Sequence, residues 1–425
     1  MEPEAKVGQI VEHLFRQEAG KIVSALTCSF GLRNLELIED AVQEALLKAL
    51  RQWSYGTVPA NPGAWLMTVA RNQALDGLRR GARWREKEEE IALTQRPMST
   101  SESAPFFADE EIRDDQLRMI FACCHPALAR ESQVALTLKI LCGFSVEEIA
   151  RAFLLPGETI AKRLTRARQR LQKEAVSFEI PAGPELATRL DAVLEVLYLL
   201  FNEGYNASQG ASLIRRDLCA EAIRLTTLLQ EHPAGDTPRT HALLALLHFQ
   251  AARFSARLDA AGEILRLQEQ DRGSWDQRLI AHGMEQLERA RAGEELSAFH
   301  LEAGIAACHS AAASYEATDW PKILLLYDLL LERNDSPVIA LNRAVALAKV
   351  RGPAAGLSAL EKIQNEPALR KYYLFYAVRA ELQLESDQAE AAARNLEKAL
   401  ALTSMPAEQD FLARKLRAVR GRGDH

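Results

Sequence analysis

The densest run of chemically distinctive side chains lies between residues 158 and 173, where six basic residues accompany one acidic residue. The segment reads Glu-Thr-Ile-Ala-Lys-Arg-Leu-Thr-Arg-Ala-Arg-Gln-Arg-Leu-Gln-Lys. Its net charge of +5 contrasts with the −6 of the whole chain. Guanidinium and ammonium groups bind phosphates, and guanidinium groups also bind the edges of guanines. The segment therefore predicts contact with a nucleic acid.

Apolar spacing around this basic run predicts two short helices joined by a turn. Val146, Ile149 and Phe153 fall on one face of the first helix, and a Pro-Gly pair at 156–157 ends it. The positions of the second helix that we expect to be buried are Ile160, Leu164 and Leu171. This is the helix-turn-helix pattern, in which the second helix enters the major groove of DNA. For the segment taken alone, a solvated basic helix in an ordinary bundle is the alternative.

A second basic helix is predicted upstream, over residues 65–80. The stripe of this helix that we expect to be buried consists of Leu66, Val69, Ala70 and Leu75. Between residues 71 and 85, five arginines accompany one aspartate, which gives a net charge of +4. Two separated basic helices predict two contacts along one nucleic acid, whereas a single helix-turn-helix repressor needs only one.

Three motifs resemble bacterial sigma factors of the extracytoplasmic-function subgroup. Residues 65–79 read Trp-Leu-x-x-Val-Ala-Arg-Asn-x-x-x-Asp-x-x-Arg, which is similar to region 2 of these proteins. Residues 40–44, Asp-Ala-Val-Gln-Glu, resemble the polymerase-facing segment of that region. Residues 158–168 resemble the recognition helix of region 4. They match it at Thr159, Arg163, Arg166, Ala167 and Arg168, and depart from it at Glu158 and at Ala161-Lys162.

The resemblance implies a protein that binds core RNA polymerase and promoter DNA. The implied polymerase contacts are Asp40, Gln43 and Glu44. The implied region 2 contacts with the minus-ten element are Asn61, Arg71, Asn72, Arg79 and Arg80. The implied region 4 contacts with the minus-thirty-five element are Thr159, Lys162, Arg163, Arg166 and Arg168. Because polymerase supplies the chemistry, we expect no enzymatic activity, cofactor or metal in this chain.

Composition favours an all-α protein. The length of 425 residues predicts two to four domains, and a hydrophobic fraction of 48% suffices for packed cores. The abundance of Ala and Leu favours helices. The six cysteines show no repeated spacing, which indicates a reducing compartment and no disulfide framework. The N-terminus is too acidic and polar for a signal peptide, and glutamates interrupt the longest apolar stretch, near residues 196–201. We therefore expect a cytoplasmic protein.

Charge changes along the chain predict its domains. We expect a region 2 domain over 1–90, a flexible acidic linker over 91–115 and a region 4 helix-turn-helix over 116–178. Residues 86–115 contain ten acidic and three basic residues, a composition that cannot bury enough apolar surface to fold alone. Residues 174–425 sum to −7, so the C-terminal half lacks an electrostatic footprint for DNA.

The C-terminal half carries signs of helical repetition. Residues 337–363 echo residues 372–403, with a period close to that of tetratricopeptide repeats. The motifs at 199–205, 271–276 and 318–346 are similar to one branch of the same sigma subgroup, in which such a domain follows region 4. We therefore expect a tetratricopeptide-like domain over 185–420 that regulates or supports sigma activity by contacting the same molecule or another protein.

Several alternatives remain open at this point. Cys123-Cys124-His125 with Cys142 could bind zinc, but no second CxxC or HxxxH pair accompanies them and cysteine is common in cores. Residues 202–205, Asn-Glu-Gly-Tyr, are either a catalytic loop or, more simply, a helix end closed by glycine. The functional alternative is a helix-turn-helix regulator with a tetratricopeptide-like sensing domain that acts without polymerase. A repeat-protein scaffold anchored by its N-terminal half is a third interpretation.

Overall fold

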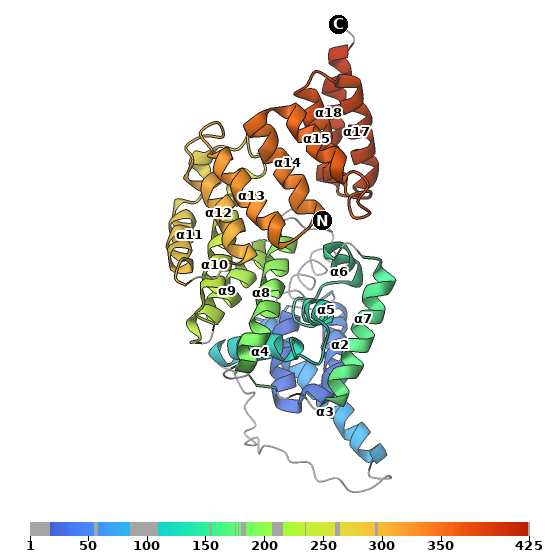
Figure 1. Ribbon diagram of the computed structural model, residues 1–425. Helices are drawn as coiled ribbons and strands as arrows, with labels where there is room; N and C mark the ends of the chain where they lie inside the picture. Colours follow the sequence, from blue (N-terminus) through green and yellow to red (C-terminus); the bar gives the residue numbers. More distant parts are fainter. Residues whose placement is uncertain are drawn as a thin grey trace. The chain divides into compact units, whose positions relative to one another are not determined.

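The computed structural model consists of helices (Figure 1). It describes residues 18–54, 58–85, 109–205 except 154, 175, 177 and 180–183, 216–259 except 234, 264–293 and 296–423. The structure is 77% helical, and the described residues contain no strand, which confirms the all-α prediction. The chain divides into two compact units, residues 1–196 and 197–425, and each is treated separately below.

The first part of unit 1 is a small helical bundle. A helix over residues 18–30 is followed by the short 3-10 turn η1 (Leu32–Asn34) and the long helices α2 (Leu35–Ser54) and α3 (Pro62–Arg85). One apolar stripe of α2 is buried, as Ile38, Val42 and Ala49 illustrate, because these residues recur at helical spacing. Helices α2 and α3 pack closely because Gly77 lets Leu37 approach its backbone, where a Cβ atom would lie only 3.0 Å from Leu37.

The buried stripe of α3 differs from the predicted one at two positions, Val69 and Leu75. Leu66 and Ala70 are fully buried as expected, but the next core residue is Ala74, whereas Val69 and Leu75 are half-buried. The core positions are therefore four residues apart. This spacing brings a small residue to the contact with α2, where the helix backbones lie close together.

The second part of unit 1 contains four helices. These are α4 (Asp109–Cys123), α5 (Arg130–Ile140), α6 (Val146–Ala152) and α7 (Gly157–Lys173). Most of the predicted acidic linker lies outside the described residues, but its end, 109–115, is helical because α4 begins at Asp109. Asp115 and Gln116 are buried, so this end of the linker belongs to the folded unit.

The boundary between the units falls within α8 (Pro184–Tyr205). The first half of this helix belongs to unit 1: the buried Arg189 donates a hydrogen bond to the carbonyl oxygen of Phe121 (3.0 Å), and Arg130 pairs with Glu195 (2.7 Å). Residues 202–205 form the last turn of α8 and not a loop, which agrees with the helix-end interpretation.

Unit 2 continues with ten further helices in the described residues, together with the 3-10 turns η2 (Phe254–Ala256) and η3 (Arg272–Ser274). The helices are α9 (Arg216–Glu231), α10 (Pro238–Ala251), α11 (Gln277–Ala290), α12 (Ala298–Ala311), α13 (Trp320–Arg333), α14 (Pro337–Arg351), α15 (Pro353–Ile363), α16 (Tyr373–Leu384), α17 (Ala389–Leu402) and α18 (Pro406–Gly423). From α12 onward, each helix packs against the next one in the chain. Such sequential packing is typical of helical repeats.

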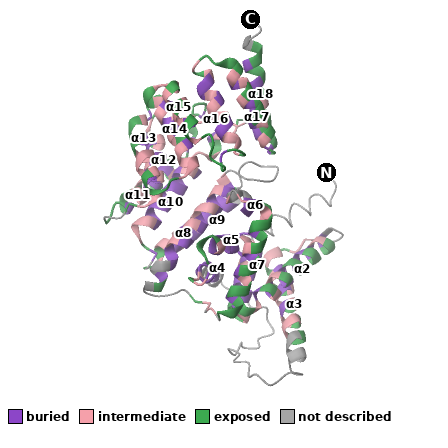
Figure 2. Ribbon diagram, turned by 45° about the vertical axis from the view of Figure 1, so that its right-hand side comes forward, coloured by how far each residue is buried: buried purple, intermediate pink, exposed green. Residues whose placement is uncertain are grey.

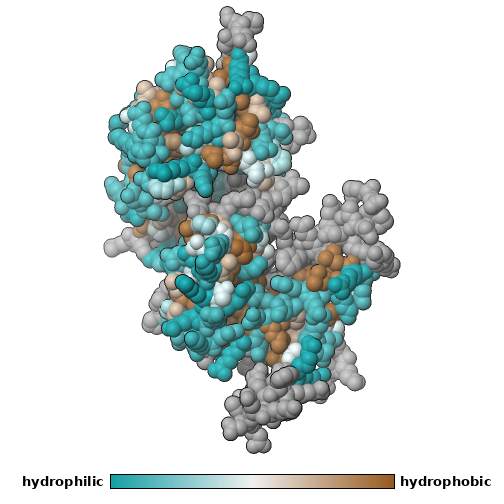
Figure 3. All heavy atoms as spheres, turned by 90° about the vertical axis from the view of Figure 1, so that its right-hand side faces the viewer, coloured by the Kyte–Doolittle hydropathy of each residue, from teal (hydrophilic) through white to brown (hydrophobic). Residues whose placement is uncertain are grey.

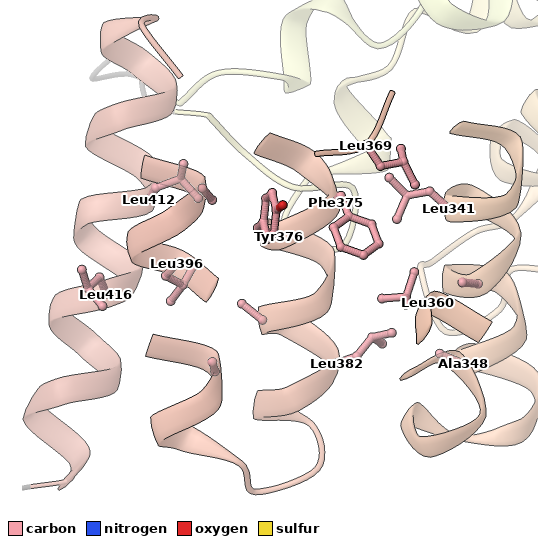
Figure 4. Close-up of a cluster of buried hydrophobic side chains, with 14 of the residues drawn as sticks. Leu341, Ala348, Leu360, Leu369, Phe375, Tyr376, Leu382, Leu396, Leu412 and Leu416 are labelled. Atoms are coloured by element: carbon pink, nitrogen blue, oxygen red, sulfur yellow. The ribbon is translucent and has the colours of Figure 1, made fainter. Parts of the chain in front are cut away.

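Equivalent positions of the two echoing segments lie in one hydrophobic core. Leu360 of α15 and Leu396 of α17 are both fully buried. In Figure 4, Phe375 of α16 lies toward Leu360, and the neighbouring Tyr376 lies toward Leu396. Ala380 is also fully buried in this cluster, at a position where a small side chain permits close helix contact. The core explains the apolar periodicity of residues 337–403.

We expect Phe375→Ala to destabilise unit 2 by about 3–5 kcal/mol, because it leaves a cavity among helices α14 to α17. Urea unfolding followed by circular dichroism measures this loss. The matched control is Leu325→Ala on α13, since 57% of the Leu325 surface is exposed and its truncation removes little packing. Equal stability of the two variants would contradict the core assigned here.

Candidate polymerase and nucleic-acid interfaces

Helices α6 and α7 form the predicted helix-turn-helix. Ser145 and Glu148 cap the start of α6 reciprocally: the Ser145 N–H donates to the Glu148 carboxylate (2.7 Å), and the Glu148 N–H donates to the Ser145 hydroxyl (3.1 Å). Pro156 directly precedes α7, and its ring fixes the backbone φ angle at the start of this helix. The buried residues of α7 are Ile160, Leu164, Ala167 and Leu171, which confirms the predicted stripe.

The cations of α7 do not all face solvent. Helix α7 shows exposed residues along one side and buried residues along the other (Figure 2). Thr159, Lys162 and Arg166 are exposed, as the DNA-binding prediction requires. Lys162 pairs with Glu158 one turn earlier (2.6 Å), an exposed ion pair that water screens strongly. Arg166 is thus the most available of the predicted DNA contacts in α7.

Two predicted DNA contacts of α7 are held by the protein itself. The Arg163 guanidinium lies 5.7 Å from the ring centre of Phe153 and is half-buried. Arg168 forms an ion pair of 3.0 Å with Glu39 of α2, in which the two side chains are 29% and 14% exposed. Burial raises the pKa of the Glu39 carboxyl, and the Arg168 guanidinium opposes that rise.

The predicted DNA contacts of region 2 are spread along α3: Asn61 directly precedes the helix, Arg71 and Asn72 lie in its middle, and Arg79 and Arg80 lie in its C-terminal half. The Asn61 side chain accepts a hydrogen bond from the Ala64 N–H (3.0 Å) and so caps the start of the helix. Asn72, Arg79 and Arg80 are exposed, and Arg71 is half-buried. Asp76, the acidic residue of this stretch, lies 3.8 Å from Arg79, with both side chains about two-thirds exposed, so most of the positive charge remains available.

A groove of about 570 Å³ lies between α2 and α3. Its lining brings together two of the predicted polymerase contacts, Asp40 and Glu44, with Arg80 of the predicted DNA contacts. Gln43 is exposed beside the groove but does not line it. Gln172, near the end of α7, also borders the groove.

Sequence reasoning missed two apolar residues of this surface. Leu47 lies one turn after Glu44 on the exposed face of α2, and 51% of its surface is exposed. Leu37 lines the groove between Glu36 and Asp40 of α2. The sequence signal that could have found them is their spacing, because both fall outside the buried stripe of α2. Leu47, for example, directly follows the buried Leu46, so the two side chains point in different directions.

Comparisons with known proteins identify this architecture. Residues 14–85 match the family model of sigma-70 region 2, and residues 118–171 match that of sigma-70 region 4. Residues 189–291 match a third model, described as a family of unknown function (DUF6596). The chain is an extracytoplasmic-function-like sigma factor with a C-terminal extension. It is 38% identical over 385 residues to an uncharacterized protein of Rhizobium meliloti (strain 1021), a match covering 90% of both chains. No solved structure matches it significantly.

Sigma regions 2 and 4 imply binding to core RNA polymerase and to promoter DNA. The basic helices α3 and α7 of this sigma factor lie one in each region. On the face drawn in Figure 3, the coloured residues are mostly hydrophilic, with smaller apolar patches. Within the described part of the sigma factor, no helix is both long enough and apolar enough to cross a bilayer.

The cysteines of region 4 belong to its core. Cys123 and Cys124 are fully buried in α4 and at its end, and burial raises the pKa of both thiols, that of Cys123 to about 12. The residues that the structure describes hold no cluster of three or more His, Cys, Asp or Glu side chains suited to a metal ion.

Proposed function

We propose that this sigma factor reads a minus-thirty-five element with α7 and opens and reads a minus-ten element with α3 and Asn61, which caps the start of α3. The observation that carries the proposal is the helix-turn-helix itself, which buries one stripe of α7 and presents Thr159, Lys162 and Arg166 to solvent. These side chains have the hydrogen-bonding groups that major-groove recognition uses. Arg163 and Arg168 join this surface when their present contacts are released.

Region 4 provides the first test. We expect Arg166→Ala to weaken promoter binding by about 1–3 kcal/mol, because an exposed guanidinium on the reading helix loses a base or phosphate contact. Arg163→Ala is expected to act in the same direction, although it also removes packing against Phe153. Band-shift titrations of holoenzyme on promoter DNA measure both effects, and binding to core polymerase serves as the control. Normal transcription by both variants would refute the assignment of α7 as the reading helix.

Region 2 has a different expected signature. We expect Arg79→Ala combined with Arg80→Ala to impair duplex opening more than initial binding, since both cations are exposed in the C-terminal half of α3, in the basic stretch that is proposed to contact the melted strand. A promoter that is already unpaired around the minus-ten element should then restore transcription by this variant. Permanganate footprinting of unpaired thymines measures opening directly. If the unpaired template gave no rescue, the residues would act before opening.

The C-terminal extension is proposed to act through proteins and not through DNA. Residues 174–425 carry a net charge of −7, which disfavours a polyanion as ligand. Sequentially packed helices, which we propose to be tetratricopeptide-like over 185–420, present surfaces suited to peptides or helices. We further propose region 2 over 1–90 and region 4 over 116–178, with the helical residues 109–115 leading directly into region 4. We also propose activity in the cytoplasm, where core polymerase and promoters occur together.

The decisive experiment is direct binding to purified core polymerase. A sigma factor must bind the core enzyme and then direct it to a promoter, whereas a helix-turn-helix regulator with a sensing domain binds DNA alone. Size-exclusion chromatography with core polymerase, followed by in vitro transcription, separates the two functions. Specific promoter binding without any association with core polymerase would favour the regulator.

A further inference from the structure

A half-buried glutamate of unit 2 lies among aromatic side chains and has no basic partner. Glu302 of α12 accepts a hydrogen bond of 2.7 Å from the Tyr198 hydroxyl of α8. Phe299, one turn before Glu302, packs against the Tyr198 ring with 5.5 Å between the ring centres. Tyr327 of α13 interacts electrostatically with the same carboxyl. No lysine, arginine or histidine of the described residues forms an ion pair with Glu302.

The helices packed on α12 do not supply the missing cation. On α10, the His248 ring lies 5.8 Å from the ring of His282 on α11, and His241 contacts Asp236 (2.8 Å). The titratable groups that face Glu302 from α8 and α13 are the two phenols, which are uncharged at neutral pH. An ionised Glu302 is therefore a charge that its surroundings leave uncompensated.

A carboxyl in this setting favours its protonated form, since a buried charge without a cation is costly. Burial raises the pKa of Glu302 from its ordinary value of 4.5 to about 7, although the Tyr198 hydrogen bond opposes the rise. Between pH 4.5 and about 7, folded unit 2 therefore holds a proton that the unfolded chain has released. The stabilisation linked to this proton is complete below pH 4.5 and is lost as the pH rises through about 7.

The glutamate lies where unit 2 holds α8. The boundary between the units follows Val196, so Tyr198 is the second residue of unit 2. The Tyr198 ring also packs against the hydrophobic core that α10, α11 and α12 share. An ionised Glu302 beside this ring regains its full hydration only if α12 moves away from α8. Ionisation therefore acts against the packing of α8 within unit 2.

We propose that Glu302 is a proton-binding switch, whose ionisation above neutral pH loosens the second half of α8 from α12 within unit 2. The proton passes to solvent and no other bond is made or broken, so the change is reversible. The inference goes beyond the proposed function, because it requires neither polymerase nor promoter DNA.

Three variants of the full chain separate titration from packing. Glu302→Gln keeps the size of the side chain and an oxygen that accepts from Tyr198, but it cannot ionise. Tyr198→Phe keeps the ring and removes the hydrogen bond that favours the ionised carboxyl. Glu332→Gln is the matched control, because this glutamate is exposed on the neighbouring helix α13.

Hydrogen exchange followed by mass spectrometry measures the opening of peptides from residues 197–205 and 298–311. Rates at about pH 6 and about pH 8.5 are compared after correction for the chemical exchange rate. We expect opening to increase about three- to tenfold at the higher pH in the unmodified protein and in Glu332→Gln. Glu302→Gln should show no such increase, and Tyr198→Phe should show a larger one.

Equal opening of the unmodified protein at both pH values would overturn the inference. The same conclusion would follow if Glu302→Gln kept the full pH effect, because another group would then be titrating. Should Glu302→Gln fail to fold, Tyr198→Phe decides the question, since a pH effect smaller than that of the unmodified protein contradicts a charge at Glu302.

Discussion

A sigma factor truncated after Val196 should lose transcription by about tenfold or more relative to the full chain, a loss of about 1.4 kcal/mol or more. The boundary between the units falls at this residue, so the cut keeps Arg189 and Glu195, which pack within unit 1. A cut near residue 180 would remove them and confuse instability with lost regulation. We expect the loss because the acidic extension has no electrostatic role toward DNA and is proposed to support the complex through protein contacts.

Run-off transcription with core polymerase measures the effect of this truncation, and band shifts with labelled polymerase report whether binding is lost as well. Circular dichroism and thermal melting of the truncated protein control for its folding. Phe375→Ala provides a second perturbation within the full chain, because it disturbs unit 2 and leaves unit 1 intact. A truncated protein equal to the full chain in both polymerase binding and transcript yield would remove any regulatory role of the extension.

Much of unit 1 was predictable because its signals are local. The periodicity of apolar residues in α7 depends only on helix geometry, so Ile160, Leu164 and Leu171 could be assigned to a buried stripe from their spacing. The break between α6 and α7 depends on a Pro-Gly pair, whose conformational limits are likewise local. The same argument holds for the buried stripe of α2.

The exposure of individual cations was not predictable, because it depends on residues far apart in sequence. Arg168 is partly buried through Glu39, which lies 129 residues earlier in the chain. The half-burial of Arg163 depends on how α6 crosses α7 and brings Phe153 beneath the guanidinium. Nothing in the charge pattern of residues 158–173 distinguishes these two arginines from the exposed Arg166.

Packing between helices also explains why Ala74 is buried where the sequence pattern predicts Leu75. The sequence pattern favours the larger Leu75 as a core residue because its burial would remove more apolar surface from water. In the structure the close approach of α2 and α3, seen at Gly77 and Leu37, places a small residue at the contact. The burial of Ala74 in place of Leu75 therefore depends on the neighbouring helix α2. The sequence of α3 alone holds no information about that neighbour.

Charge reversal of the α2 surface should have the largest effect on polymerase binding. We expect Asp40→Lys combined with Glu44→Lys to raise the Kd for core polymerase by about 100-fold or more. Both carboxylates line one groove, and reversing their charge creates repulsion toward a partner surface that is complementary to negative charge. Both residues are exposed, so the change should leave the fold of region 2 intact. Fluorescence anisotropy with purified core polymerase measures the Kd.

The matched control is Glu361→Lys combined with Asp410→Lys, which changes the net charge equally at exposed positions of unit 2. A similar loss in both double variants would show a general charge effect and contradict a specific site on α2. Leu47→Ser separates the apolar contribution, since 51% of this leucine is exposed one turn beyond Glu44. If polymerase uses this face, the leucine is covered in the complex, and its replacement should weaken binding by increasing the dissociation rate while the association rate changes little.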